Sequence, residues 1–425
     1  MGPVLVSIAP LLAGTALLQL GNGALGTLLA LGMSAQGVPT WVIGAVGTAY
    51  FSGLIAGTFF AHRLISNVGH IRAYTALGST FSAATLAHPF LPDPLAWGAL
   101  RFVEGFCISG LFMCTESWLN ERATNKVRGS IFSIYQITVY SALGSGQFLL
   151  NLGSIEGFGL FVVASIMVSL AVVPVAITRV EAPQLPELTR FGFARLYAIS
   201  PLGVVGCFAA GLVLGAFYGL GPVYAQQIGL DIPATTQFMG ITIVGGLLLQ
   251  WPIGRLSDHF DRRTVMIGLC LATFAVSLAI VFATGRTVVG LLVLGPVFGG
   301  VVFTLYPLAV AHANDYIEPR HLVSASGGLV LAYSIGAGIG PLLAAALMTV
   351  TGPMGLFEFA GAAALGTALF AFWRMQRREA VEDQAPFQAM PKTTPLAAEL
   401  DPRGEDAPPT VDSDDEAGET GEPAP

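Results

Sequence analysis

The chain has 425 residues, of which 54% are hydrophobic and 11% are charged, and its mean hydropathy is +0.71. A soluble protein of this length needs many more charged residues on its surface, so the composition excludes a soluble protein and indicates an integral membrane protein. The formal net charge is −7, but the excess of acidic residues lies beyond Arg378, and the mildly basic remainder gives no reason to expect a nucleic-acid partner.

Apolar stretches of roughly 20 residues recur along the chain, and each is long enough to cross about 30 Å of hydrocarbon as a helix. The first stretch contains no Lys or Arg and is not followed by an evident cleavage site, so we interpret it as a membrane helix and not as a signal peptide. The predicted spans are residues 5–31, 40–62, 72–91, 95–118, 130–152, 158–178, 201–223, 236–254, 264–283, 288–311, 323–348 and 354–374.

The basic residues between these spans are distributed unevenly. If the N-terminus lies inside, the inside loops hold nearly all of the loop bases and the outside loops hold only Arg286. Positively charged loops tend to stay on the cytoplasmic side of a membrane. The sequence therefore predicts a multi-pass protein of the bacterial inner membrane with both termini in the cytoplasm.

A polar stretch near the middle divides the spans into six and six. This stretch is RVEAPQLPELTRFGFAR, residues 179–195, and its prolines and mixed charges suit a linker. The region after the last span is rich in Pro, Ala, Glu and Asp, which predicts disorder. The expected units are an N-terminal six-helix bundle (1–178), a cytoplasmic linker (179–200), a C-terminal six-helix bundle (201–375) and a disordered acidic cytoplasmic tail (376–425).

The segment GRLSDHFDRR, residues 254–263, gathers five charged side chains between two apolar spans. It resembles the loop signature of the major facilitator superfamily, roughly G-x-L-A-D-R-x-G-R-R. The corresponding first-half segment, residues 57–72, is degraded and has Ser66 at the usual Asp position. Further segments are similar to the YcaD-like branch of that superfamily: RFVEG (101–105), ES (116–117), RG (128–129), LGAFYGL (214–220), QWPIGRLSD (250–258) and FTLYPLAV (303–310).

The resemblance covers about residues 5–375 and implies the major facilitator fold. That fold is all-α and membrane-integral, with twelve transmembrane helices in two pseudo-symmetric six-helix bundles. The resemblance also implies a cytoplasmic gate formed by Gly254, Asp258, Arg262 and Arg263. In this gate Asp258 meets the N-terminus of the fifth helix across the two halves and favours the outward-facing state, while Gly254 permits close helix packing. The alternative is a solvated loop in which Arg262 and Arg263 contact lipid phosphates.

Three charged residues lie in or near the fourth span. Arg101 and Glu104 are three residues apart, so they share a helix face and can form an ion pair. Charges inside a membrane usually face a cavity and pair, and the family resemblance implies a role for Arg101 in proton coupling. Glu116 should lie near the inside surface, within reach of Arg122 or Arg128. The alternative for all three coupling candidates is a static structural role.

Uncharged polar side chains recur in the spans that line the central cavity of this family. As a set they resemble a wall of aromatic faces and neutral hydrogen-bonding groups for a substrate, although each of them can also satisfy a neighbouring helix. The candidate substrate-binding residues are Gln19, Asn22, Tyr50, Gln136, Tyr140, Gln147, Tyr218, Tyr306 and Tyr333.

These features predict a secondary active transporter that moves a small organic solute by alternating access, with a proton as the coupling ion. Export of amphipathic compounds and uptake of a metabolite both remain open. The sequence has no Walker A pattern, catalytic triad or metal-ligand spacing, so we expect no enzyme activity, cofactor or metal. We expect a monomer in contact with membrane lipids. The alternative is a non-transporting membrane sensor or scaffold that recruits a partner through its acidic tail.

Overall fold

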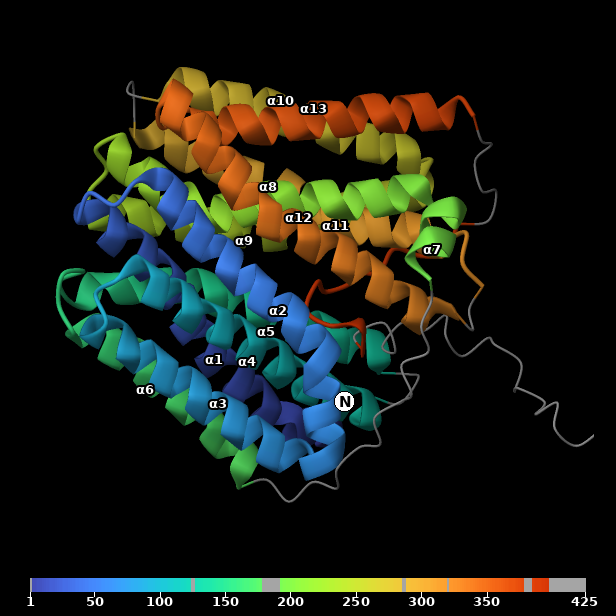
Figure 1. Cartoon of the computed structure of the whole chain (residues 1–425). Coiled ribbons are helices and arrows are strands. Elements are labelled where there is room, and N and C mark those ends of the chain that lie inside the picture. Colours follow the sequence, from blue (N-terminus) through green and yellow to red (C-terminus); the bar gives the residue numbers. More distant parts are fainter. Residues whose placement is uncertain are drawn as a thin grey trace, which may run out of the picture.

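The computed structural model describes residues 2–123, 127–177, 192–284, 288–318, 321–377 and 384–396 (Figure 1). Every regular element in these ranges is a helix, as the sequence predicts. The long helices are α1 (Gly2–Ala35), α2 (Thr40–Val68), α3 (His70–Ala87), α4 (Pro94–Arg122), α5 (Arg128–Gly146), α6 (Gly159–Ala176), α8 (Pro201–Gln227), α9 (Ile232–His259), α10 (Arg262–Ala283), α11 (Val288–Asn314), α12 (Leu322–Thr351) and α13 (Gly355–Met375). The short ones are α7 (Phe193–Ile199) and the 3-10 helices η1 (His88–Phe90) and η2 (Gln147–Leu152).

Within the described ranges, 10 helices are long and apolar enough to cross a membrane, and α3 and α5 are the long helices not among them. Each predicted span overlaps one long helix. Some boundaries are wrong: the predicted spans end at residues 62 and 254, whereas α2 continues to Val68 and α9 to His259. Most of the charged motif is therefore helical, with α9 ending and α10 beginning inside it. Of the predicted linker, residues 179–191 lie outside the described residues, and α7 forms in its last part.

Short acidic side chains cap the N-termini of α4 and α9. Asp93 accepts hydrogen bonds from the N–H groups of Leu95 and Ala96 (2.9 and 3.0 Å), and Asp231 accepts one from the N–H of Ala234 (2.9 Å). A proline stands in the first turn of each helix, where its missing N–H costs no hydrogen bond. These caps fix where α4 and α9 start.

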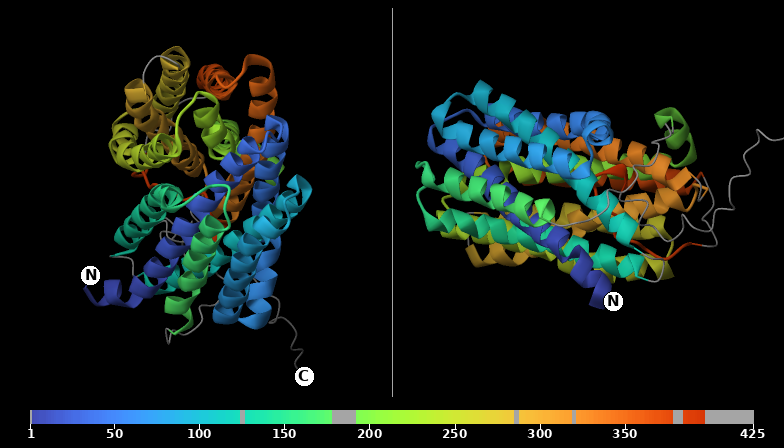
Figure 2. Two further views of the ribbon diagram at one scale, coloured as in Figure 1. Left: turned by 90° about the vertical axis from the view of Figure 1, so that its left-hand side faces the viewer. Right: turned by 90° about the horizontal axis from the view of Figure 1, so that it is seen from below.

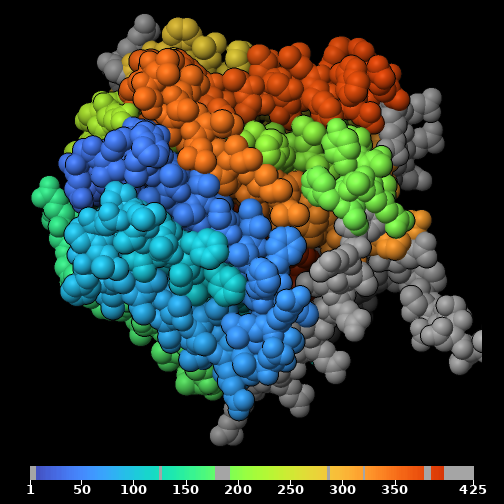
Figure 3. Space-filling model, viewed as in Figure 1, coloured from blue at the N-terminus to red at the C-terminus, as the bar shows by residue number. Residues whose placement is uncertain are grey.

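The helices pack in two groups that follow the order of the chain. In the first group α1 packs on α5 and α6, while α4 packs on α2 and α3; in the second, α8 packs on α11, α12 and α13. Figure 1 shows most of α1–α6 below α8–α13, with α2 and α12 side by side at the boundary, and the left view of Figure 2 shows the same division from another side. The groups meet where α2 contacts α12 (blue on orange in Figure 3) and where α5 contacts α9.

Glycines permit close helix contacts inside each group. Gly105 of α4 faces the backbone carbonyl of Tyr50 in α2, and Gly336 of α12 faces that of Phe208 in α8, with no room for a Cβ atom in either place. Small residues of this kind let helix backbones approach in a membrane, where van der Waals packing drives association. Each group therefore contains one closely packed helix pair, α2 with α4 in the first group and α8 with α12 in the second.

Candidate functional site

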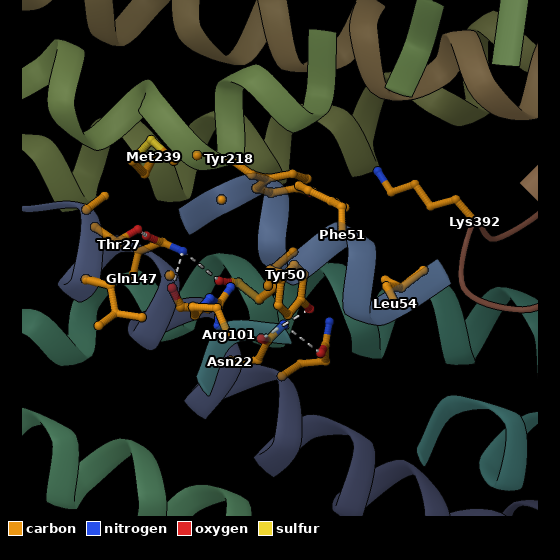
Figure 4. Close-up of a pocket in the computed structure, with 18 of the residues that line it drawn as sticks. Asn22, Thr27, Tyr50, Phe51, Leu54, Arg101, Gln147, Tyr218, Met239 and Lys392 are labelled. Carbon is orange, nitrogen blue, oxygen red and sulfur yellow. Dashed lines mark hydrogen bonds between the residues drawn. The ribbon is translucent and has the colours of Figure 1, made fainter. Parts of the chain in front are cut away.

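A cavity of about 160 Å³ lies between the two helix groups. Its walls come from α1, α2, α4, α5, η2, α8, α9 and α12, and from part of residues 384–396, which we call the docked segment. Figure 4 shows polar side chains converging on this space from both groups. Because the lining combines apolar residues with a few amides, phenols and charges, it has the character of a binding site for a small organic molecule.

The structure brings most of the predicted substrate-binding residues to this cavity. The exception is Tyr306, which is buried behind the wall, where its ring packs edge-on against Tyr333 with 5.1 Å between centroids. The predicted residues that line the cavity are Gln19, Asn22, Tyr50, Gln136, Tyr140, Gln147, Tyr218 and Tyr333.

Two of these polar residues, Gln147 and Asn22, have hydrogen-bond partners in neighbouring helices. The amide of Gln147 donates to the carbonyl of Gly23 (2.9 Å), and its Oε1 accepts from the hydroxyl of Thr27 (2.5 Å). Asn22 donates to Gln19 and accepts from the hydroxyl of Tyr50, at 3.5 and 3.4 Å. The shorter bonds of Gln147 hold α1 against η2, whereas the long bonds of Asn22 leave its amide available to a ligand.

A buried ion pair lies on the α4 side of the cavity. Nη1 of Arg101 donates to Oε2 of Glu104 at 2.9 Å, and the side chains are 9% and 0% exposed. The guanidinium lies 4.0 Å from the ring centroid of Tyr50, on the cavity side. Glu104 is thus shielded from the cavity by Arg101, whose charge it balances.

Two further residues of this network, His88 and Thr85, were not predicted from the sequence. Nδ1 of His88 lies 3.6 Å from Oε1 of Glu104, and the hydroxyl of Thr85 donates to the same oxygen at 3.4 Å. Nδ1 of His88 lies 3.0 Å from the carbonyl of Ala84, so that nitrogen carries its proton. The sequence feature that could have indicated His88 is its position at the end of an apolar run, directly before Pro89.

Glu116 lies deeper than the sequence analysis expected. Its side chain is fully buried, and its Oε1 accepts a hydrogen bond from the hydroxyl of Tyr135 in α5 (2.8 Å). The hydroxyls of Thr393 and Thr394 in the docked segment also donate to its two oxygens. Glu116 therefore holds the docked segment, and the expected pairing with Arg122 or Arg128 is replaced by these three hydroxyl donors.

The docked segment fills one end of the cavity. That end, where α2, α4 and α9 finish, carries Arg63, Arg122, Arg262 and other bases, and we call it the basic end. Met390, Thr394 and Leu396 are buried there, although the sequence analysis predicted disorder from residue 376 onward. The other parts of that predicted tail, residues 378–383 and 397–425, lie outside the described residues.

At the opposite end of the cavity the two helix groups contact each other directly. The hydroxyl of Thr48 in α2 donates to the carbonyl of Gly338 in α12 at 2.6 Å. At the separate contact between η2 and α9, the amide of Asn151 donates to the hydroxyl of Thr236 at 3.2 Å. The cavity is therefore closed at this end by helix contacts and at the basic end by the docked segment.

The charged motif at the end of α9 also contacts the docked segment. A carboxylate oxygen of Asp258 accepts from the N–H of Phe387 at 2.6 Å, and the ring of Phe387 lies against Gly254, where a Cβ atom would clash. Arg262 pairs with Asp315 (2.9 Å) and also donates to the carbonyl of Ala385. In this conformation the motif therefore holds a segment of the same chain.

Arg263 has a more local role in the motif. Its side chain donates to Asp261 with a closest distance of 2.7 Å, and its own N–H donates to the same carboxylate at 2.9 Å, so Asp261 caps α10. Partial burial acts to raise the pKa of Asp261, but the hydrogen bonds from Arg263 outweigh it and hold the pKa below its usual value. Within the described ranges, no group of three or more His, Cys, Asp and Glu side chains could hold a metal ion.

Comparison with known proteins identifies relatives over most of the chain. A family model described as Major Facilitator Superfamily matches residues 11–251 and 238–405. The "Uncharacterized MFS-type transporter YcaD" of Salmonella arizonae is 31% identical over 341 residues, which cover 80% of this chain and 88% of that protein. Among solved structures, the nucleoside transporter NupG superposes with a TM-score of 0.68 at 14% identity, covering 88% of this chain and all but 1% of that one.

A second solved structure extends the match in fold. A bacterial homologue of the human lysosomal transporter Spinster, in an inward-facing and unoccupied conformation, superposes with a TM-score of 0.65 at 12% identity. The match covers 93% of this chain and 97% of that chain. At such identities the two structures show a shared fold.

Proposed function

The chain belongs to the major facilitator superfamily, and from this premise we propose that it is a secondary active transporter that moves a small organic solute across the inner membrane by alternating access. Its relatives are named as transporters, and the chain is a multi-pass membrane transporter and not an enzyme. The observation that carries the proposal is the cavity between the two helix groups, lined by both and closed differently at its two ends.

The packing of the helices supports two six-helix bundles, α1–α6 and α8–α13, as the moving parts. Helix pairs pack extensively within each group, whereas the groups meet along α2–α12 and α5–α9 at the end opposite to the basic end. A rocking motion of two rigid bundles would open those contacts and close the basic end. The present conformation is then the one in which the solute site faces the basic end.

The distribution of positive charge supports the orientation of the protein. Bases gather at the end of the bundle where the docked segment lies, and positive loops remain on the cytoplasmic side. We therefore assign the basic end to the cytoplasm, place both termini there, and describe the structure as inward-facing with the docked segment in its mouth. One chain encloses the cavity from both sides, which supports a functional monomer.

The ion pair of Arg101 and Glu104 supports proton coupling. A buried carboxylate in a membrane is costly unless it is paired, and Glu104 has its pair only while Arg101 stays beside it. Protonation of Glu104 would remove the charge that holds Arg101 and let the guanidinium turn toward the cavity that it lines. A solute that contacts Arg101 and a proton on Glu104 would thereby depend on each other.

A ligand screen tests the proposal directly. Purified protein is heated with a panel of small organic solutes, and a true substrate is expected to raise the unfolding temperature because it binds the folded state alone. Hits are then followed into proteoliposomes with and without a pH gradient. Uptake that responds to the gradient supports the proposal, whereas hits that bind but never cross the membrane under any gradient overturn it.

A further inference from the structure

The side chain of Lys392 enters the cavity from the docked segment (Figure 4). Its ammonium group ends among four aromatic rings. Its Nζ lies 4.7 Å from the ring centroid of Phe303, 5.4 Å from that of Tyr333, 5.5 Å from that of Tyr218 and 5.7 Å from that of Tyr140. Each of these distances is within the range in which the negative face of a ring attracts a cation. We call these four residues the ring cage.

The ring cage is built from both helix groups. Tyr140 belongs to α5, and the other three rings come from α8, α11 and α12. The rings also support one another: Phe303 packs edge-on against Tyr140 and Tyr218, with 5.6 and 5.8 Å between centroids. A cation in the ring cage therefore contacts both moving bodies of the proposed transporter.

Among the described residues, no hydrogen-bond acceptor meets the ammonium group of Lys392. Nζ of Lys392 is buried and has no hydrogen-bond partner among the described residues. A primary ammonium normally donates up to three hydrogen bonds. A site that surrounds a cation with rings and offers it no oxygen suits an ammonium that has carbon substituents in place of N–H groups.

The segment around Lys392 is anchored by polar contacts on both sides. Gln136 donates to the carbonyl of Ala389 (3.2 Å), and Thr393 and Thr394 donate to Glu116. Removal of the segment would leave the carboxylate of Glu116 facing the space next to the ring cage. A buried acid beside aromatic rings supplies a counter-charge for a bound cation.

Burial also acts on the lysine itself. It lowers the pKa of Lys392 to about 7, whereas the ring faces oppose this shift because they stabilise only the charged form. A quaternary ammonium keeps its charge at every pH and is therefore a better match to the ring cage than a lysine.

We infer that the ring cage of Tyr140, Tyr218, Phe303 and Tyr333 is a binding site for an organic ammonium ligand, and that Lys392 of the docked segment occupies it as an internal competitor. The inference rests on the proposed function in one respect: the ligand of the ring cage is taken to be the class of solute that the transporter carries. Binding itself can be measured without transport.

The first experiment removes the competitor. Choline is titrated calorimetrically into the purified full-length protein, together with 3,3-dimethylbutan-1-ol, which has the same shape and no charge. Lys392→Ala is expected to raise the association constant of choline about tenfold or more, because an internal competitor acts at a high effective concentration. Lys392→Arg keeps a cation in place and should bind choline as weakly as the wild type.

The second experiment alters the ring cage in the Lys392→Ala background. Tyr218→Leu should lower the choline association constant by roughly tenfold, because it removes one ring face. Tyr218→Phe keeps the ring and loses only a hydroxyl that has no hydrogen-bond partner among the described residues, so it should bind normally. As a control, Phe298→Leu removes a ring that lies on the same helix as Phe303 and outside the ring cage.

Three results would overturn the inference. They are equal choline affinity in the wild type and in Lys392→Ala, an equal gain for the neutral alcohol, and equal affinity of Tyr218→Leu and Tyr218→Phe. Choline that binds with the expected pattern but never enters proteoliposomes would leave the ring cage standing and count against transport of this class. The two proposals can therefore fail separately.

Discussion

The two sides of the cavity are built from different chemistry. The side formed by α1–α6 carries Arg101, Glu104 and Glu116, all buried. The side formed by α8–α13 offers the rings of Tyr218, Phe303 and Tyr333. Charges inside a membrane must be paired at close range, whereas rings can contact a ligand without being ionised. The two groups therefore contribute different chemistry to one cavity: the buried charges of Arg101, Glu104 and Glu116 come from α1–α6, and three of the four rings of the ring cage come from α8–α13.

The charged motifs at the basic end differ in the same way. Ser66 stands where the first group would carry the motif acid, and its hydroxyl donates to the carbonyl of Arg63 in its own helix at 3.1 Å. In the second group Asp258 reaches the docked segment instead. The second helix group, which carries none of Arg101, Glu104 and Glu116, is thus the one whose end motif contacts the docked segment.

The largest effect is expected from tying the two groups together. A Cβ atom on Gly47 would lie 3.6 Å from the Cβ of Pro341, within the spacing of a disulfide. Gly47→Cys with Pro341→Cys should form a cross-link under oxidation that abolishes transport, because the contact between α2 and α12 could no longer open. Uptake of the solute found in the ligand screen, measured with and without reductant, checks this.

A matched cross-link inside one group is the control. A Cβ atom on Gly361 of α13 would lie 3.3 Å from that of Ser277 in α10. Gly361→Cys with Ser277→Cys should leave transport intact, since these helices are expected to move together. The native cysteines are buried, so background oxidation is small. Full transport through the Gly47–Pro341 cross-link would contradict the idea of two bodies that rock apart.

The next largest effect concerns the charged side of the cavity. Glu104→Gln leaves the guanidinium of Arg101 buried without its counter-charge, so we expect the free energy of unfolding to fall by about 3–5 kcal/mol and proton-driven uptake to be lost. Arg101→Gln combined with Glu104→Gln removes both charges and should recover much of the stability without recovering coupling. Denaturant unfolding in detergent measures the change in stability, and uptake with and without a pH gradient measures the change in coupling. A double variant that still couples uptake to protons would assign the coupling elsewhere.

Much of this arrangement is predictable from the sequence, because it follows from local rules. Apolar runs long enough to cross a membrane gave the long helices, and the spacing of Arg101 and Glu104 gave their ion pair. The residues that line the cavity were predicted from the family resemblance, which indicates which spans face the cavity. These features depend on helix periodicity and on the avoidance of unpaired charge in lipid.

The docked segment was not predictable in this way. Its composition is that of a disordered tail, and it has no apolar periodicity of its own. Its order comes from partners such as Glu116 and Gln136, which are more than 250 residues away along the chain. The contacts of Phe387 with Gly254 and of Lys392 with the ring cage exist only in the folded chain. Such contacts are tertiary, and no local pattern in the tail encodes them.

A smaller effect is expected at the anchor of the docked segment. Thr394→Val removes a buried donor to Glu116, which costs about 1–3 kcal/mol of docking free energy. Trypsin should then cleave after Lys392 roughly tenfold faster, because the bond is accessible only in the undocked state. The rate at which the fragment beginning at Thr393 appears measures this. Thr264→Val, on the exposed start of α10, is the matched control.

If Thr394→Val and Thr264→Val are cleaved at the same rate, Glu116 does not hold the segment. The burial of Glu116 would then result from its contacts within α1–α6 and not from the docked segment. That outcome would return Glu116 to the static structural role and remove the link between the charged side of the cavity and the tail.

The smallest effect is expected at Asp258. Its side chain is 30% exposed, so replacing its charge by Asp258→Asn should weaken the contact with the N–H of Phe387 by no more than about 1 kcal/mol. Cleavage after Lys392 should rise by a few-fold, and Glu358→Gln on the exposed face of α13 should leave it unchanged.

If Asp258 instead bonds across the two helix groups in the outward-facing state, Asp258→Asn will also shift the balance of the two conformations. This balance is measured by labelling a cysteine placed at Asn22 from either side of the membrane. A change in cleavage alone assigns Asp258 to the tail, a change in labelling alone assigns it to the gate, and no change in either removes it from both.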